Sequence, residues 1–235
     1  IAFINEIADL CDAMAANVQR VARGIGHDNP NGPKFLNAGP GYGGSCFPKD
    51  TLALSRTATL NASPMTIVDA VIAANDKRKA RMGDLIIEAA GGDVSGKTVA
   101  LLGLTFKPNT DDMREAPSLS IVPTLQAAGA SIRAFDPEGQ VEAAKHFEGI
   151  TFANGAYECL DGADLAVIIT EWDQFRALDL GRISTLLREH TLIDLRNIYD
   201  RDDAAAAGLT YHSIGRPHQK AAAEEASNVH VIRRA

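Results

Sequence analysis

A glycine-rich segment around a single cysteine carries the most chemical information in this chain of 235 residues. Residues 39–50 read Gly-Pro-Gly-Tyr-Gly-Gly-Ser-Cys-Phe-Pro-Lys-Asp, and the cysteine is Cys46. Glycines let a backbone approach a ligand closely and turn its N–H groups towards it, and Cys46 stands just before an expected helix N-terminus. Both features stabilise anions, so Cys46, with Lys49 nearby, is predicted to act as a nucleophile at neutral pH. Asp50, one helical turn later, is placed to orient a water or a lysine.

The same segment has a second interpretation, in which Cys46 is a small apolar side chain buried in a tight turn. The other two cysteines, Cys11 and Cys159, have apolar neighbours and nothing nearby to activate them, so both are expected in the core. The sequence has no CxxC pair and no Cys/His spacing typical of zinc, so no metal site is predicted.

A charged loop follows an apolar run in the second half of the chain. Residues 103–108 read GLTFKP and come directly after a predicted strand, at the carboxyl edge where open α/β sheets bind ligands. The spacing is not GxGxxG, which argues against a dinucleotide pyrophosphate site here. The loop carries Lys107 and Arg114 among three acidic residues, which indicates either an anion-binding loop or a merely solvated one.

Arg196 directly follows another predicted strand, again at the carboxyl edge. It is therefore a candidate to converge with Lys107 on a phosphate. An ion pair with Asp194 or Asp200 is the alternative interpretation.

Residues 1–92 have the apolar spacing of helices. Apolar residues recur every three or four positions over residues 7–21, which predicts one amphipathic helix that two glycines then end. A long loop rich in Gly and Pro is expected over residues 24–44. A second helix is predicted over 48–60 and a third over 65–90, so this part of the chain is expected to be an all-helical domain.

Residues 93–216 change to short apolar runs that alternate with helical segments, the pattern of βα units in a parallel sheet. Strands are predicted at residues 98–103, 132–135, 165–170, 191–195 and 209–214, with a weaker one at 150–152. Helices are predicted at residues 118–128, 138–146, 156–160, 180–189 and 202–207. The fold class is therefore α/β, with an all-helical central domain followed by a Rossmann-like, doubly wound parallel-sheet domain. Residues 217–235 lack periodicity and are expected to form a poorly ordered tail.

Composition and charge exclude several classes of function. The chain has 23 Lys and Arg against 30 Asp and Glu, and this net charge of −7 argues against nonspecific nucleic-acid binding. The longest stretch without a charged residue, 116–132, is shorter and more polar than the roughly 20 apolar residues of a membrane span. Three cysteines and no charged-then-apolar leader fit a cytoplasmic protein with a free thiol. Because Ile1 stands inside a predicted helix, we expect the chain to be part of a longer polypeptide.

Together these motifs resemble the UDP-glucose/GDP-mannose dehydrogenase family of nucleotide-sugar 6-dehydrogenases, and most of all its UDP-glucose branch. The resemblance rests on Asn5-Glu6, residues 39–50, residues 103–118, Thr170-Glu171-Trp172 and residues 194–197. Family members have an N-terminal Rossmann domain for NAD, a central helical domain and a C-terminal UDP-binding domain, and the chain resembles the last two. The resemblance implies a four-electron oxidation of UDP-glucose to UDP-glucuronate with NAD, through a thiohemiacetal and a thioester on Cys46, in a homodimer formed by the central helices.

The resemblance also implies roles for single residues. Cys46 would be the nucleophile, and Asp50 would help to position the catalytic water. Lys49 and Arg114 would lie near the NAD. The sugar nucleotide would be bound by Phe35, Leu36, Asn37, Tyr42, Gly43, Phe106, Lys107 and Arg196.

One position departs from the family pattern. Pro30 stands where many relatives carry an arginine that reaches the substrate of the partner subunit, so this contact is not carried over, and Lys34 is a possible substitute. Relatives that oxidise GDP-mannose or UDP-N-acetylhexosamines share the cysteine motif and remain an alternative. A different class is a UDP-sugar binding and dimerisation module without turnover, because no hydride-acceptor site is recognised in this chain.

Overall fold

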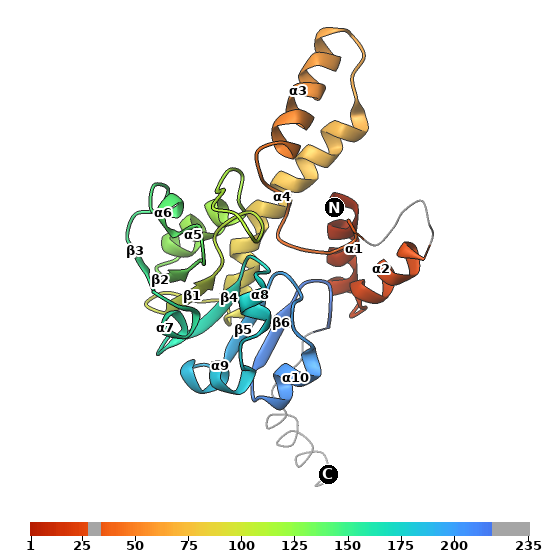
Figure 1. The fold of residues 1–235 in the computed structure, drawn as a ribbon. Coiled ribbons are helices and arrows are strands. Elements are labelled where there is room, and N and C mark those ends of the chain that lie inside the picture. The colour runs from red at the N-terminus through yellow and green to blue at the C-terminus, as the bar shows by residue number, and fades with distance from the viewer. Residues whose placement is uncertain (28–33, 218–235) are drawn as a thin grey trace.

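Four helices precede a six-stranded sheet in the computed structural model, which describes residues 1–27 and 34–217. The four helices are α1 (Ala2–Ala13), α2 (Val18–Gly26), α3 (Phe47–Leu60) and α4 (Thr66–Ala89). α3 and the first half of α4 form a hairpin that projects away from the rest of the molecule, and the second half of α4 packs beside α5 (Ser118–Ala127) (Figure 1). The unusual Pro30 and all of the predicted tail except Pro217 lie outside the described residues.

The single helix predicted over residues 7–21 is wrong, because the chain forms two helices there. The backbone leaves helical geometry at Ala15, whose φ is 51°. Asn17 then caps α2, and its Oδ1 accepts hydrogen bonds from the N–H groups of Gln19 and Arg20 at 2.9 and 3.3 Å. The apolar spacing continues across the break because both helices pack against the same core, so periodicity alone does not reveal it.

The sheet is parallel throughout, as predicted, with the strand order β3-β2-β1-β4-β5-β6. Its strands are β1 (Thr98–Leu102), β2 (Ser131–Phe135), β3 (Ile150–Phe152), β4 (Leu165–Ile168), β5 (Thr191–Asp194) and β6 (Thr210–Ser213). This order places the reversal of winding between β1 and β4. Ligands of open α/β sheets often bind at such a reversal. Here the loops that follow the two strands are in contact, because the Thr170 hydroxyl donates to the Thr105 carbonyl oxygen at 2.6 Å.

Short helices complete the α/β part: α6 (Gln140–Ala143), α7 (Ala156–Leu160), α8 (Asp173–Arg176), α9 (Leu180–Leu186) and α10 (Arg201–Ala206). α6 and α9 are shorter than the spans predicted for them, residues 138–146 and 180–189. α8 was not predicted at all, because four residues are too few to show a helical period. No described helix combines the length and the apolar character needed to cross a bilayer.

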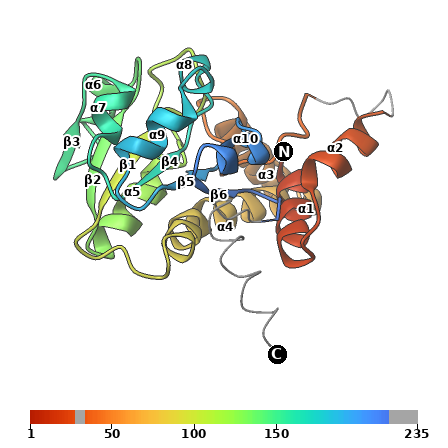
Figure 2. The same cartoon turned by 90° about the horizontal axis from the view of Figure 1, so that it is seen from below.

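Two apolar clusters cover the two faces of the sheet. One cluster joins α1 and α4 to α5 and to one face of the sheet, through residues such as Ile4, Met82, Leu101 and Ile121. The other cluster packs α7, α9 and α10 on the opposite face (Figure 2). The first cluster runs without interruption from the helical part into the α/β part, so the two parts share a core at their junction.

Candidate functional site

The cysteine loop (residues 39–46) lies directly against the β1 loop (residues 103–117). The Gly44 N–H donates to the carbonyl oxygen of Arg114 at 2.8 Å. Gly44 has a φ of 95°, and a Cβ there would lie 2.7 Å from the ring of Phe106. Glycine is therefore required at this position both by the backbone conformation and by the neighbouring ring.

Gly43 and α4 strengthen the same contact. A Cβ on Gly43 would lie 2.3 Å from the carbonyl oxygen of Glu115, so the two backbones meet only because a side chain is absent. The Lys79 ammonium of α4, largely buried, is 2.7 Å from the Glu115 carboxylate. The sequence predicts that these glycines bring the backbone and its N–H groups close to a ligand. In the structure Gly43 and Gly44 instead bring the cysteine loop against the β1 loop, and the Gly44 N–H is bonded to the Arg114 carbonyl oxygen.

Cys46 is exposed and occupies the N-cap position of α3. The interpretation that it is buried in a tight turn is therefore wrong. The Ser45 hydroxyl lies 3.6 Å from its Sγ. Unpaired N–H groups of the first helical turn favour a negative charge at this end of a helix, which suits a thiolate. Cys11 and Cys159 are buried, as predicted.

Lys49, Asp50 and Arg114 are the charged residues predicted to act near Cys46. The Asp50 carboxylate is 3.4 Å from the Lys49 ammonium, and both side chains are exposed. Arg114 is exposed and makes a two-pronged hydrogen bond to Asp112 at 2.9 and 2.8 Å. This bond is the main reason why the pKa of Arg114 is raised, and the nearby Cys46 acts in the same direction. Arg114 and Cys46 are therefore close enough for their charges to interact.

Lys107 extends from the β1 loop into solvent. Its ammonium lies 5.4 Å from the centre of the Phe106 ring. Within the described part of the chain, Lys107 has no ion-pair partner, so its charge is available to an anion. Phe106 is half-buried against the cysteine loop and offers a flat apolar face to a ring.

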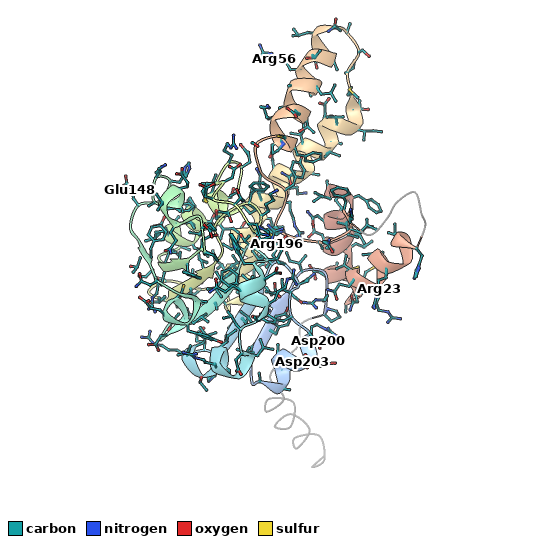
Figure 3. All side chains as sticks on the ribbon, in the orientation of Figure 1. Arg23, Arg56, Glu148, Arg196, Asp200 and Asp203 are labelled. Carbon is teal, nitrogen blue, oxygen red and sulfur yellow. The ribbon has the colours of Figure 1, made fainter. Side chains whose placement is uncertain are left out.

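Arg196 lies where the helical part meets the carboxyl edge of the sheet (Figure 3). Its side chain is 14% exposed and forms an ion pair with the Glu171 carboxylate at 3.0 Å. Asp194, one of the two predicted partners, accepts from the Arg196 backbone N–H at 2.9 Å and adds a second nearby negative charge. Two carbonyl oxygens also accept from it, those of Ile169 at 2.7 Å and Phe106 at 3.2 Å. Burial lowers the pKa of Arg196, and the charge of Glu171 opposes this effect. Arg196 thus ties the ends of β4 and β5 to the β1 loop.

These side chains line a cleft of about 580 Å³ between the two parts. Its predicted lining residues are Phe35, Asn37, Tyr42, Gly43, Phe106, Lys107 and Arg196, and Lys34, Gly41, Phe47 and Glu171 complete the wall together with Ile1. Leu36 lines a neighbouring cleft of about 640 Å³, which shares Asn37, Glu171 and Arg196 with the first. Cys46 is not in the wall itself but stands between Gly43 and Phe47, which are. Glu171 was missed as a site residue, although it belongs to one of the motifs quoted above.

Asp136, directly after β2, fills the place where a dinucleotide-binding loop would hold phosphate. Its fully buried carboxylate accepts hydrogen bonds from the N–H groups of Leu104 and Thr105 at 2.7 and 3.1 Å. In dinucleotide-binding folds the amides after β1 bind the pyrophosphate. The N–H groups of Leu104 and Thr105 are therefore already bonded to Asp136 and are not free to bind a pyrophosphate. No group of three or more metal-binding side chains occurs among the residues that the structure describes.

The structure is a doubly wound parallel α/β fold joined to a helical part, with a cleft at their junction and an exposed cysteine beside that cleft. Residues 1–77 match the central domain of the UDP-glucose/GDP-mannose dehydrogenase family, and residues 100–201 match the UDP-binding domain of the same family. The chain belongs to this family.

Sequence identity to curated relatives supports the assignment to this family. The chain is 56% identical over 217 residues to a UDP-glucose 6-dehydrogenase of Rhizobium meliloti and 42% identical over 218 residues to one of Bacillus subtilis. These matches cover 92% of the chain and 50% and 47% of the relatives, so the chain spans about half the length of the curated relatives it matches.

Solved structures agree with the fold. A UDP-glucose dehydrogenase from the archaeon Pyrobaculum islandicum is 32% identical, with a TM-score of 0.77 over 90% of the chain and 46% of that structure. An NDP-N-acetyl-D-galactosaminuronic acid dehydrogenase from Methanosarcina mazei is 28% identical, with a TM-score of 0.81 over 92% of the chain and 48% of that structure.

Proposed function

We propose that this chain is the substrate-binding and nucleophile-bearing part of an NAD-dependent UDP-glucose 6-dehydrogenase. The observation that carries this proposal is the exposed Cys46 at the start of α3, next to a cleft built from the cysteine loop and the β1 loop. Lys107 provides a cation and Phe106 a flat face on the other wall, which suits a phosphate and a base. The relatives that share the most sequence among those named above are UDP-glucose 6-dehydrogenases.

Cys46 acts on the aldehyde at C6 of the sugar. Its thiolate sulfur forms a bond to the carbonyl carbon, the carbonyl electron pair moves to the oxygen, and the oxygen takes up a proton to give a thiohemiacetal. Once this carbon is oxidised to a thioester, water adds to it, the carbon–sulfur bond breaks, and the acid and the thiol are released. Asp50 positions that water. When bound, NAD would supply the hydride acceptor, and no hydride step is assigned to the residues of this chain.

The remaining predicted residues take binding roles in this proposal. The nucleotide sugar is held by Phe35, Leu36, Asn37, Tyr42, Gly43, Phe106, Lys107 and Arg196, and Lys49 and Arg114 face the NAD. The domains are residues 1–92 and 93–216, and two copies pair through the helical domain. Three free cysteines suit the reducing cytoplasm.

Calorimetric titration of the chain tests the binding part of the proposal. UDP and UDP-glucose are expected to bind, whereas NAD is not. Lys107→Ala is expected to weaken UDP binding by roughly 1–3 kcal/mol, the scale of a lost charge-assisted hydrogen bond. Lys145→Ala, an exposed lysine paired with Glu142 away from the cleft, is the matched control and should leave binding unchanged.

Other results of the titration discriminate between the alternatives. Stronger binding of GDP-mannose or a UDP-N-acetylhexosamine than of UDP-glucose would move the chain to another branch of the family. Absence of binding by any nucleotide sugar would contradict the proposal. Acid production by the chain alone with NAD would contradict the conclusion that its residues do not bind the hydride acceptor.

A further inference from the structure

One asparagine on α4 holds the backbone of the cysteine loop. Asn75 is 3% exposed, and its Oδ1 accepts from the Tyr42 N–H at 2.8 Å while its Nδ2 donates to the Tyr42 carbonyl oxygen at 3.1 Å. A single side chain thus satisfies both backbone groups of Tyr42, as a paired strand would. Tyr42 is therefore fixed to α4 independently of its own side chain.

Gly39 is held in the same way by two helices. Its N–H donates to Asn5 Oδ1 of α1 at 2.9 Å, and its carbonyl oxygen accepts from Arg78 Nε of α4 at 3.0 Å. Arg78 is 4% exposed and also pairs with Asp9 of α1, which locks the two helices together. Three buried side chains therefore make four hydrogen bonds to two residues of one loop.

This arrangement is not the one that stability alone would favour. Asn5 Nδ2 and Arg78 Nη2 are buried and have no acceptor among the described residues. An unsatisfied buried donor destabilises the fold, and buried charged groups are often replaced by apolar ones without loss of stability. Polar groups kept at such a cost are typical of a site where position matters more than stability.

The hydrogen bonds to Gly39 and Tyr42 also affect the position of Cys46, because Tyr42 packs against the residue that follows it. The Tyr42 ring packs edge-on against the ring of Phe47, with the ring centres 4.6 Å apart, and Phe47 is the first residue of α3, directly after Cys46. We propose that Asn5, Asn75 and Arg78 are positioning residues, which fix the cysteine loop so that the Cys46 thiol stays at the N-terminus of α3 beside the cleft. The catalytic meaning of this role rests on the proposed function, but the positioning itself is measurable without turnover.

The test measures the alkylation rate of Cys46 by iodoacetamide, followed by mass spectrometry of its peptide. Asn75→Leu removes both hydrogen bonds to Tyr42 at similar volume, and Arg78→Met removes the bond to Gly39 together with a buried unsatisfied donor. Each is expected to slow the alkylation of Cys46 about two- to five-fold, the scale of the effect of a helix N-terminus on a charged group. Lys77→Ala, an exposed lysine on the same helix, is the matched control and should react like the unchanged chain.

Thermal unfolding and UDP-glucose titration are measured on the same proteins, with alkylation carried out well below each midpoint. Alkylation at the unchanged rate in both variants, with only a lowered midpoint, would overturn the inference, because it would show a purely structural role. Slowed alkylation in variants of a chain that binds no UDP-glucose would support the positioning role while contradicting the proposed function. If one variant does not fold, the other decides the result.

Discussion

At the scale of single residues, the three cysteines differ in burial and therefore in their expected reactivity. Cys46 is exposed at a helix N-terminus, whereas Cys159 is fully buried with its Sγ 3.3 Å from the Arg133 carbonyl oxygen. Burial raises the pKa of Cys159 to about 12, so this thiol stays protonated and unreactive at neutral pH. A reagent for thiolates should therefore select Cys46.

The raised pKa of Cys159 predicts a loss of folding stability at alkaline pH. The folded-state pKa of Cys159 is above its ordinary value of 9.0. The stability that the buried, protonated thiol contributes to the folded state is therefore fully present below pH 9 and is lost as the pH rises towards 12. Burial raises the pKa values of Tyr199 and Tyr211 as well, which adds to the loss in the same direction. The free energy of unfolding is measured with urea at about pH 8 and about pH 10.5. Between these two pH values it should fall by roughly 2 kcal/mol less in Cys159→Ala than in the unchanged chain. Equal losses in the two proteins would show that Cys159 does not titrate as a buried thiol.

The sequence predicts two of the charged residues that line the cleft, Lys107 and Arg196, but not the ion-pair partner of Arg196. Arg196 was placed at the carboxyl edge of the sheet, which the structure confirms, yet its two suggested partners lie near it in sequence. Its actual partner, Glu171, follows β4, and the two meet because β4 and β5 are adjacent in the sheet. Strand order decides such a pairing, and strand order is not encoded in local spacing.

At the scale of elements, the site depends on how closely two loops approach each other. Gly43→Ala would place a Cβ 2.3 Å from the Glu115 carbonyl oxygen and push the cysteine loop away from the β1 loop. We expect this change to lower the free energy of unfolding by roughly 1–3 kcal/mol, the usual cost of overpacking, and to weaken UDP-glucose binding as measured by calorimetry. Gly24→Ala in α2 is the control, because a Cβ there meets nothing within 4 Å and should stabilise the helix by up to about 1 kcal/mol. Unchanged binding by Gly43→Ala would show that the loop contact is not needed for the ligand.

Helices and strands could be predicted where the periodic pattern of apolar residues was clear. Six strands and the long helix α4 follow from hydrophobic periodicity, and their ends differ from prediction by at most two residues. The break between α1 and α2 was not found, because it depends on the backbone of Ala15 and on the cap formed by Asn17. The sequence predicts that the cysteine loop binds a ligand, but it does not predict the contacts of this loop with Asn75 and Arg78. Those contacts join residues more than 30 positions apart and follow only from the tertiary fold.

At the scale of the whole molecule, α4 connects two regions of different character. Its second half lies in the shared core beside α5, where Gly83 allows close contact with Thr124. Its first half forms, with α3, the projecting hairpin of Figure 1. Large apolar side chains are exposed on this hairpin, at Leu52, Leu54, Leu60, Met65 and Ile67. An apolar surface of this kind indicates an interface, and we expect a second copy of the chain to cover it.

The expected assembly is therefore a dimer that depends on the hairpin. Light scattering after size-exclusion chromatography should give about twice the chain mass of 25.0 kDa. Leu60 and Ile67 are 76% and 79% exposed, and the double change Leu60→Glu and Ile67→Glu should produce a monomer, because charges at an apolar interface lose hydration without gaining partners. Val141→Glu is the matched control, since Val141 is 75% exposed but lies on α6, away from the hairpin. A monomeric unchanged chain at high concentration, or a double variant that remains a dimer, would show that the hairpin is not the interface.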